Sequence, residues 1–426
     1  MAFLGMRGNG DWVTDQRPKN WREKILQLYP NGDAPLTAIM SMMRSESTDD
    51  PEFNWWTKSL ATQAAAVTGK YTDATMASAY ATGAVAGDTI YVKAAEASVK
   101  EFRAGHQVLL INTANYADNT NGKVLSTTLN GASSQIAVKL LQADPTTTGI
   151  ADVNRILIIG NINAEGAVMP SAIAYDPTKH YNYTQIFRTP LSITRTARKT
   201  KLRTGDQYKE AKREALELHS IEMEKALLFS IRTEGTGANG KPERTTGGLI
   251  PAIIDYSGNV SSFTSDTDFT NSTWLENGEE WLDKWLEQIF RYGSDDRLAL
   301  CGTGVILAIN KLIKEYGSYE FSSSTMDYGI KVKTWTTPFG SIHCKIHPLF
   351  SYEESYRDTM VIFDPKDLVY RYIDDTTFYG EGEKQNTGRG RIDGTDEEFL
   401  TEAGLEHHHY AKMGMLTGFG DDNGTP

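Results

Sequence analysis

The stretch GDQYKEAKREALELHSIEMEKALLFSIRTE, residues 205–234, decides the fold of this 426-residue chain. It predicts one long helix over 206–232, because Lys, Glu, Ala and Leu are strong helix formers and the side chain of Asp206 can cap the first turn. We expect Gly235 and Gly237 to end the helix, since glycine adopts the left-handed conformation of a helix end at little cost. At about 1.5 Å per residue such a helix spans roughly 40 Å, which is long for a globular protein.

The predicted helix carries two apolar stripes. At about 100° per residue, one arc contains Tyr208, Ala211, Ala215, Leu218, Ala226 and Phe229, and another contains Leu216, Met223, Leu227 and Ile231. An ordinary core helix is one interpretation. The other is a helix between two layers of protein, whose second stripe is covered by other parts of an assembly. On that interpretation the candidate contact residues are Met223, Leu227 and Ile231.

The composition predicts a folded protein with about two or three structural units. Hydrophobic residues make up 39% of the chain and charged residues 23%, as in globular domains. The net charge of −12 argues against a protein that coats nucleic acid, because attraction to phosphates needs a basic surface. Cys301 and Cys344 indicate no disulfide framework, so a reducing cytosol is the default. We expect neither a signal peptide nor a membrane span, since no apolar run reaches about 18 residues.

Two regions before the helix differ from it in composition. Residues 1–50 contain short helical patterns with little local core, and we expect an arm that packs on the body or on a neighbouring subunit. Residues 76–170 are rich in Thr, Ala, Gly and Asn, and their short apolar runs are separated by turns, which predicts a small all-β barrel or sandwich. The runs occupy residues 87–92, 105–111, 122–129, 134–141 and 154–162.

A basic segment, residues 181–203, leads into the helix. Alternating apolar and polar side chains predict a strand, and Pro190 restricts it to a sheet edge or an extended ribbon. A solvated charged edge is one interpretation; a projecting ribbon that places its charge on an acidic neighbour is the other. The second interpretation adds candidate contact residues in this segment and in the aromatic patch FNWW: Arg188, Arg195, Arg198, Lys199, Lys201, Trp55 and Trp56.

The segment after the helix predicts an α/β unit over about 245–375. An amphipathic helix over 272–290, a buried strand over 297–301 and a second helix over 304–316 are followed by strands at 329–335, 340–347 and 359–363. The last part of the chain predicts one or two further strands and a polar tail.

No motif in the sequence assembles a catalytic, metal or cofactor site. Gly235, Gly240 and Lys241 resemble a phosphate-binding loop, but Pro242 stands where that loop needs a hydroxyl. In the cluster His343, Cys344 and His347, the cysteine would point away from both histidines on a strand. Neighbouring residues 407–409 are all histidines and cannot all face one ion on a strand. We therefore predict a protein that is not an enzyme and binds no metal or cofactor.

The order of these parts resembles the major capsid protein of tailed phages, the Hong Kong 97-type fold, in the branch with a β domain inserted in the extended loop. The likeness covers most of the chain and is clearest in four stretches, LYPNGDAPLTAIM (28–40), PEFNWWTKSL (51–60), GKPERTTGGLI (240–250) and EFLTEAGLEHHHYAKMGMLTGF (398–419). The resemblance implies an α+β fold. Its parts would be an N-terminal arm (1–50), an extended loop (51–75 and 171–203), an inserted β domain (76–170), a spine helix and turn in the peripheral domain (204–245), an axial α/β domain (246–375) and a return to the peripheral domain with the tail (376–426).

The resemblance implies a coat protein that assembles with itself, as pentamers and hexamers, into an icosahedral shell around viral double-stranded DNA. It would be located in the virion capsid after assembly in the host cytoplasm, with portal, scaffolding and decoration proteins as further candidate partners. It would enclose DNA without sequence-specific binding and would not contact a membrane.

Two other functions stay open on the sequence alone. An encapsulin-like nanocompartment shares the fold and encloses enzyme cargo. A tail protein could bind carbohydrate through the β domain, although Tyr91, Phe102 and Tyr116 are too scattered to form a stacking platform for sugars.

Overall fold

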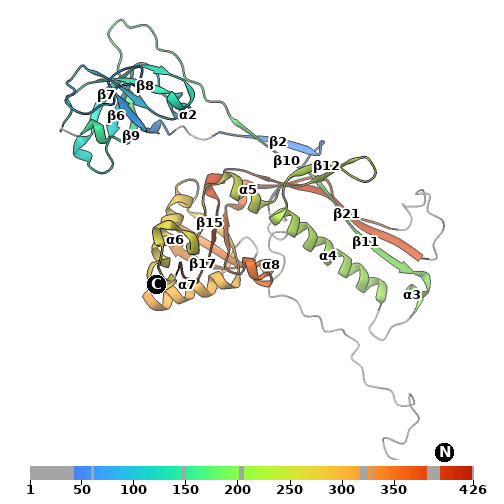
Figure 1. Ribbon diagram of the computed structural model, residues 1–426. Coiled ribbons are helices and arrows are strands. Elements are labelled where there is room, and N and C mark those ends of the chain that lie inside the picture. The colour runs from blue at the N-terminus through green and yellow to red at the C-terminus, as the bar shows by residue number, and fades with distance from the viewer. Residues whose placement is uncertain are drawn as a thin grey trace, which may run out of the picture. The chain divides into compact units, whose positions relative to one another are not determined.

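The computed structural model describes residues 43–58, 62–145, 149–200, 206–316, 325–327, 330–380 and 394–424. Most of the predicted arm (1–42) and Lys201 lie outside these residues. The chain divides into two compact units, coloured along the sequence in Figure 1. The first, here called the body, comprises the chain up to Trp55 and from Lys179 onward, and the second, the β unit, runs from Trp56 to Thr178.

The β unit is a seven-stranded antiparallel sheet in the order β3-β9-β6-β7-β8-β5-β4. Each of the five apolar runs in the sequence forms a strand. The strands are β3 (Ala64–Ala66), β4 (Gly69–Tyr71), β5 (Thr89–Lys93), β6 (His106–Ile111), β7 (Thr120–Thr128), β8 (Gln135–Leu140) and β9 (Arg155–Asn161), with the short helix α2 (Glu96–Val99) between β5 and β6. Val92, Val108, Val124, Val138 and Ile156 fill its centre.

The sheet of the β unit closes into a barrel. Its two outermost strands, β3 and β4, are consecutive in the chain, and β3 pairs with β9 while β4 pairs with β5. Between them, the N–H groups of Val67 and Thr68 donate to the carbonyls of Asn154 and Lys93, so both ladders continue across the junction. One bent stretch, residues 64–71, therefore pairs with β9 through its first half and with β5 through its second half, which joins the two ends of the sheet.

The first sheet of the body has four strands in the order β1-β20-β21-β11. Strand β11 (Gln185–Thr194) runs antiparallel to β21 (Gly394–His407), β21 runs antiparallel to β20 (Leu368–Tyr379), and β1 (Arg44–Ser47) adds parallel to β20. Strand β11 is an edge strand, as the missing N–H of Pro190 predicts. The long helix α4 (Gln207–Phe229) lies along one face of β11 and β21 (Figure 1).

The start of α4 confirms the sequence prediction, and its end differs from it. The Asp206 side chain accepts a hydrogen bond from Tyr208 N at 3.1 Å, as expected for a cap. The helix ends at Phe229, three residues before the predicted end at Arg232, because the chain turns into a hairpin of β12 (Thr233–Thr236) and β13 (Pro242–Thr245). Gly235 and Gly237 belong to that hairpin and do not end the helix.

The second sheet of the body has seven strands in the order β14-β22-β19-β15-β18-β17-β16. At its centre β15 (Asp296–Cys301) pairs parallel with β18 (Gly340–Ile346) and antiparallel with β19 (Met360–Phe363). The outer strands are β14 (Val260–Ser262), β22 (Gly414–Thr417), β17 (Ile330–Thr337) and β16 (Thr325–Asp327). The helices that accompany it are α5 (Leu249–Tyr256), α6 (Trp274–Phe290), α7 (Thr303–Tyr316) and α8 (Pro348–Tyr352).

Helix α6 follows the predicted pattern closely. It begins with a capping box, in which Thr273 and Glu276 satisfy each other's exposed backbone N–H groups. Its apolar face buries Trp281, Leu286 and Ile289 in a core shared with β15, β18 and α7. Among the described helices, none combines the length and apolar character that a membrane crossing needs.

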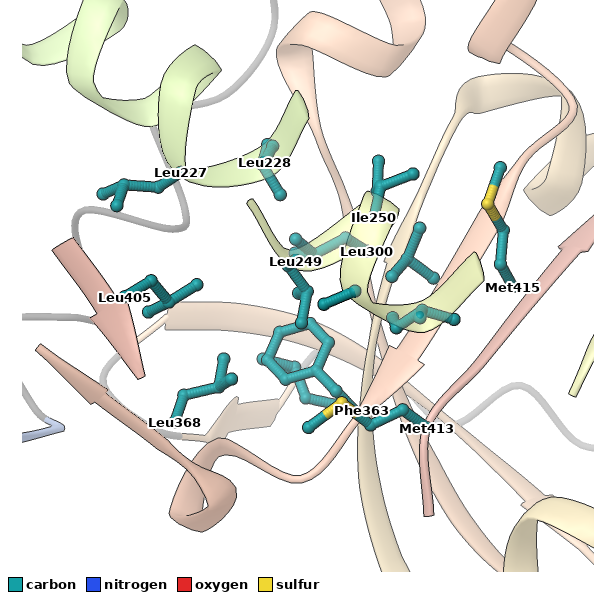
Figure 2. Packing of buried hydrophobic residues seen from close by; sticks show 14 of the residues in the cluster. Leu227, Leu228, Leu249, Ile250, Leu300, Phe363, Leu368, Leu405, Met413 and Met415 are labelled. Carbon is teal, nitrogen blue, oxygen red and sulfur yellow. The ribbon is translucent and has the colours of Figure 1, made fainter. Parts of the chain in front are cut away.

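A single hydrophobic core joins the two sheets of the body. Figure 2 shows Leu227 and Leu228 at the end of α4 beside Leu249 and Ile250 of α5. The same cluster includes Leu300 and Phe363 from the second sheet and Leu368 and Leu405 from the first. The end of α4 is thus covered from both sides by its own chain, so the two sheets behave as parts of one unit.

Candidate functional site

The candidate contact residues differ in how much surface they offer. Trp56 and Ile231 are 63% and 65% exposed, and the basic residues Arg188, Arg195, Arg198 and Lys199 are exposed as well. Trp55, Met223 and Leu227 are buried. Trp56, Ile231 and these basic side chains therefore lie at the surface of the single chain.

The prediction that Met223 and Leu227 face another subunit does not agree with the structure. Both side chains lie in the core that joins α4 to α5 and the two sheets. The helical wheel placed them in an outer stripe because it contains no information on α5, which packs across the last turns of α4. The apolar side chains that α4 leaves exposed are Leu216, Leu218 and Ile221, the last two being 55% and 38% exposed and one turn apart.

A histidine fastens the middle of α4 to the first sheet. His219 is buried, and its Nδ1 lies 2.9 Å from Thr189 Oγ1 of β11 while its Nε2 lies 2.8 Å from Thr401 Oγ1 of β21. Burial lowers the pKa of His219, so the ring is neutral near pH 7. Two neutral hydrogen bonds satisfy both ring nitrogens, which explains why a polar residue is stable at this buried position.

A second buried polar pair fastens the end of α4 to α8. Glu224 Oε1 lies 2.9 Å from His347 Nε2, and both side chains are almost completely buried. The N–H of Leu349 donates to His347 Nδ1 at 3.1 Å, so the ring proton is on Nε2 and is donated to the carboxylate. Periodicity of apolar residues gives no sign of either pair, because buried polar side chains on a helix look like surface residues in the sequence.

Part of the basic segment forms an ion pair within its own chain. Arg188 Nε donates to Glu398 Oε2 at 3.0 Å and its Nη2 donates to Oε1 at 2.7 Å, a two-pronged ion pair across β11 and β21. The acidic partner of Arg188 is therefore Glu398, on a strand of the same sheet. Arg198 lies on the short helix α3 (Arg195–Lys199), with its guanidinium 4.8 Å from the centre of the Tyr208 ring.

The face of the first sheet opposite α4 is acidic. Phe187, Leu191 and Ile193 of β11 are buried on the α4 side, so the alternate residues face away from the helix. The register of β11 with β21 places three carboxylates on that opposite face, those of Asp396, Glu398 and Glu402. Glu402 also pairs with Asp374 of β20, which adds a fourth carboxylate at this surface. The basic helix α3 lies at the end of β11, so one body carries an acidic sheet face and a basic tip.

Among the described residues, no group of three or more His, Cys, Asp or Glu side chains could hold a metal ion. The buried polar pairs of α4 connect this helix to other secondary-structure elements of the body.

Comparison with known proteins identifies the family. The model of the SU10 major capsid protein family matches residues 8–420. The chain therefore belongs to the SU10 major capsid protein family, and its function is that of a major capsid protein. The expected resemblance to tailed-phage coat proteins is confirmed, and the family places the chain in the virion capsid.

Individual relatives are distant. The chain is 24% identical over 384 residues to a major capsid protein of Pseudomonas phage PaMx41, with 89% of this chain and 85% of the relative covered. A structure from Mycobacterium phage Cain is 8% identical, with 98% and 96% of the two chains covered and a TM-score of 0.46. The SrpI encapsulin complex from Synechococcus elongatus PCC 7942 is 12% identical, with 58% and 76% covered and a TM-score of 0.39. The family assignment rests on the match of the family model.

Proposed function

We propose that this chain assembles with itself, through pentamers and hexamers, into an icosahedral shell of the Hong Kong 97 type that encloses a double-stranded DNA genome. The observation that carries the proposal is the match of the capsid family model over residues 8–420. The net charge of −12 supports a shell that surrounds DNA without binding it tightly, because a negative surface repels phosphate.

The parts of the structure receive roles in this proposal. Helix α4 acts as the spine helix and, with the first sheet, forms the peripheral domain. The second sheet and helices α5 to α8 form the axial domain. Strands β2 (Glu52–Thr57) and β10 (Thr178–Tyr183), which pair as a two-stranded ribbon, belong to the extended loop. The separate compactness of the β unit supports a domain inserted in that loop.

The contacts between copies follow from the charged surfaces. We assign the basic helix α3 of one copy to the acidic sheet face of another, which carries Asp374, Asp396 and Glu402. The basic surface of one copy attracts the acidic surface of another, whereas two surfaces of the same charge repel each other. Leu218 and Ile221 on α4 are exposed apolar side chains, and assembly would bury their surface away from water.

Further partners belong to the same proposal. A shell that is filled with DNA needs a portal, and scaffolding and decoration proteins are candidate partners during assembly in the host cytoplasm. An encapsulin-like compartment is the alternative shell, and the match to a phage capsid family favours the phage coat.

The proposal is tested by light scattering coupled to size-exclusion chromatography of the full chain, with ionic strength varied. We expect very large particles, or stable pentamers and hexamers that convert to them. Since salt screens surface charges, the equilibrium between these small oligomers and the large particles should shift with ionic strength. A monomer at every concentration and ionic strength would overturn the proposal.

A further inference from the structure

The ribbon of β2 and β10 is fastened to the body by one tryptophan among three histidines. Trp55, on β2, is 6% exposed. Its ring stacks on His180 of β10 with 6.0 Å between ring centres. The rings of His407 and His408, at the end of β21 and just after it, lie 5.4 Å and 6.0 Å from the same ring. The four residues come from three segments that are far apart in the sequence, and all belong to the body.

Packing alone holds the indole of Trp55 in this cluster. Its Nε1 is buried and has no hydrogen-bond partner among the described residues. A buried N–H without an acceptor destabilises the folded state by roughly 1–3 kcal/mol, because it has lost its hydrogen bond to water. Trp55 is therefore held by packing against the surrounding rings and not by a hydrogen bond of its indole N–H.

The groups around the histidines make positive charge unfavourable there. Arg232 lies over the Tyr181 ring at 3.8 Å and donates to the Tyr181 carbonyl at 2.6 Å, next to His180. The phenol oxygen of Tyr410 lies 2.8 Å from His407 Nδ1, and the Tyr256 ring lies 5.6 Å from His180.

The carboxylate of Glu406 lies beside this cluster. It binds His408 Nε2 at 2.5 Å and also forms an ion pair with Arg371. This negative charge is thus already shared between two partners.

Burial is the main cause of the lowered pKa values of His180 and His407. It lowers the pKa of His407 to about 4, with His408, His180 and Arg232 acting in the same direction. Burial and the neighbouring Arg232 and His408 also lower the pKa of His180. The folded, closed cluster thus binds fewer protons than an open one below the ordinary histidine pKa of 6.5, and acid favours opening.

We propose that Trp55, His180 and His407 form a proton-operated latch at the root of the β2–β10 ribbon. With neutral imidazoles the latch is closed and Trp55 holds the ribbon on the body. Protons that add to His180 and His407 place two cations beside Arg232, and their repulsion expels Trp55 and releases both strands. Strand β2 leads into the β unit and strand β10 leads out of it, so the latch decides how firmly these two connecting strands are held.

The latch goes beyond the coat function and does not depend on it, since every contact lies within one copy. The test measures hydrogen–deuterium exchange of the full-length protein by mass spectrometry, corrected for the intrinsic pH dependence of exchange, over peptides covering 52–57 and 178–183. Emission of Trp55, taken as wild type minus Trp55→Phe, is followed in parallel. On acidification from pH 7.5 to 4.5 we expect exchange in both strands to accelerate roughly tenfold, together with a change in Trp55 emission.

Three variants make the test specific. His180→Gln should move the transition to lower pH, and His180→Gln combined with His407→Gln should remove it above about pH 4. His106→Gln is the matched control, because His106 lies in the β unit and burial lowers its pKa too. Exchange that does not depend on pH, or a transition that His106→Gln shifts as much as His180→Gln, would overturn the proposal. If the double variant fails to fold, the single His180→Gln variant still decides.

Discussion

Glu224 on α4 and His347 before α8 form a hydrogen bond of 2.9 Å between Oε1 and Nε2 in the interior of the body. This pair, together with the leucines around it, fixes the end of α4 to the second sheet. The first prediction concerns its energy. Glu224→Leu leaves the His347 N–H without its acceptor and should destabilise the protein by about 3 kcal/mol, measured by urea unfolding. Glu214→Leu, at an exposed position of the same helix, is the control and should change stability by less than about 0.5 kcal/mol. Equal effects of the two substitutions would contradict the role of the pair.

The second prediction separates the core side of α4 from its outer side. Met223→Ala should cost about 2–4 kcal/mol of unfolding free energy, because it leaves a cavity in the shared core. Leu218→Asp should change the unfolding free energy by less than about 0.5 kcal/mol and should slow assembly, since the side chain is exposed in the single chain. Unfolding curves and light scattering are measured on the same preparations. If Leu218→Asp assembles normally, this face of α4 takes no part in the contacts between subunits.

The third prediction concerns the ion pair of Arg188 and Glu398. Reversal of one charge, Arg188→Glu, should destabilise the chain by about 1 kcal/mol, and the swap Arg188→Glu with Glu398→Arg should restore most of it. Thermal unfolding of the single, the partner and the double variant gives the coupling energy. If Arg188 mainly served a neighbouring subunit, the double swap would not recover the lost stability.

The fourth prediction addresses the basic tip. Lys199→Glu on α3 should leave the fold intact and reduce the rate of assembly roughly tenfold at low salt, with a smaller effect at high salt, because screening weakens surface attraction. Lys139→Glu, an exposed lysine of the β unit, is the matched reversal and should leave the rate unchanged. A rate that Lys199→Glu does not alter would exclude α3 as a charged contact.

The fifth prediction concerns acid stability. His219 is buried and neutral, and burial holds its pKa below the ordinary value of 6.5. The unfolded chain therefore binds a proton that the folded chain does not, so stability is complete above about pH 6.5 and falls as the pH decreases below it. His219→Gln keeps hydrogen-bonding groups at this position and should make the unfolding free energy less dependent on pH between 7 and 5. An unchanged pH dependence would contradict the neutral, doubly bonded ring.

Local patterns predicted much of the fold. The cap at Asp206, the amphipathic helix over 272–290 and the five apolar runs of the β unit all depend on neighbouring residues, and each appears in the structure. The end of α4 was placed three residues too late, because pairing of β12 with β13 competes with the last helical turn. Such pairing lies outside the window that helix propensity considers.

The contact residues were harder to predict, because contacts over long sequence separations decide them. Met223 and Leu227 were assigned to the surface, yet α5 and the second sheet cover them. The cluster around Trp55 joins positions 55, 180 and 407, which no local pattern connects. His219 and Glu224 interrupt an apolar stripe in the sequence, and only their partners on other elements explain their burial.

Assembly of this chain into a shell of its own copies is visible in an electron micrograph of the purified full-length protein, taken at the ionic strength that light scattering selects. We expect closed, roughly spherical particles of uniform diameter with pentameric and hexameric clusters on their surface. Fields that contain monomers or irregular aggregates alone, under every condition in which the chain is folded, would contradict it.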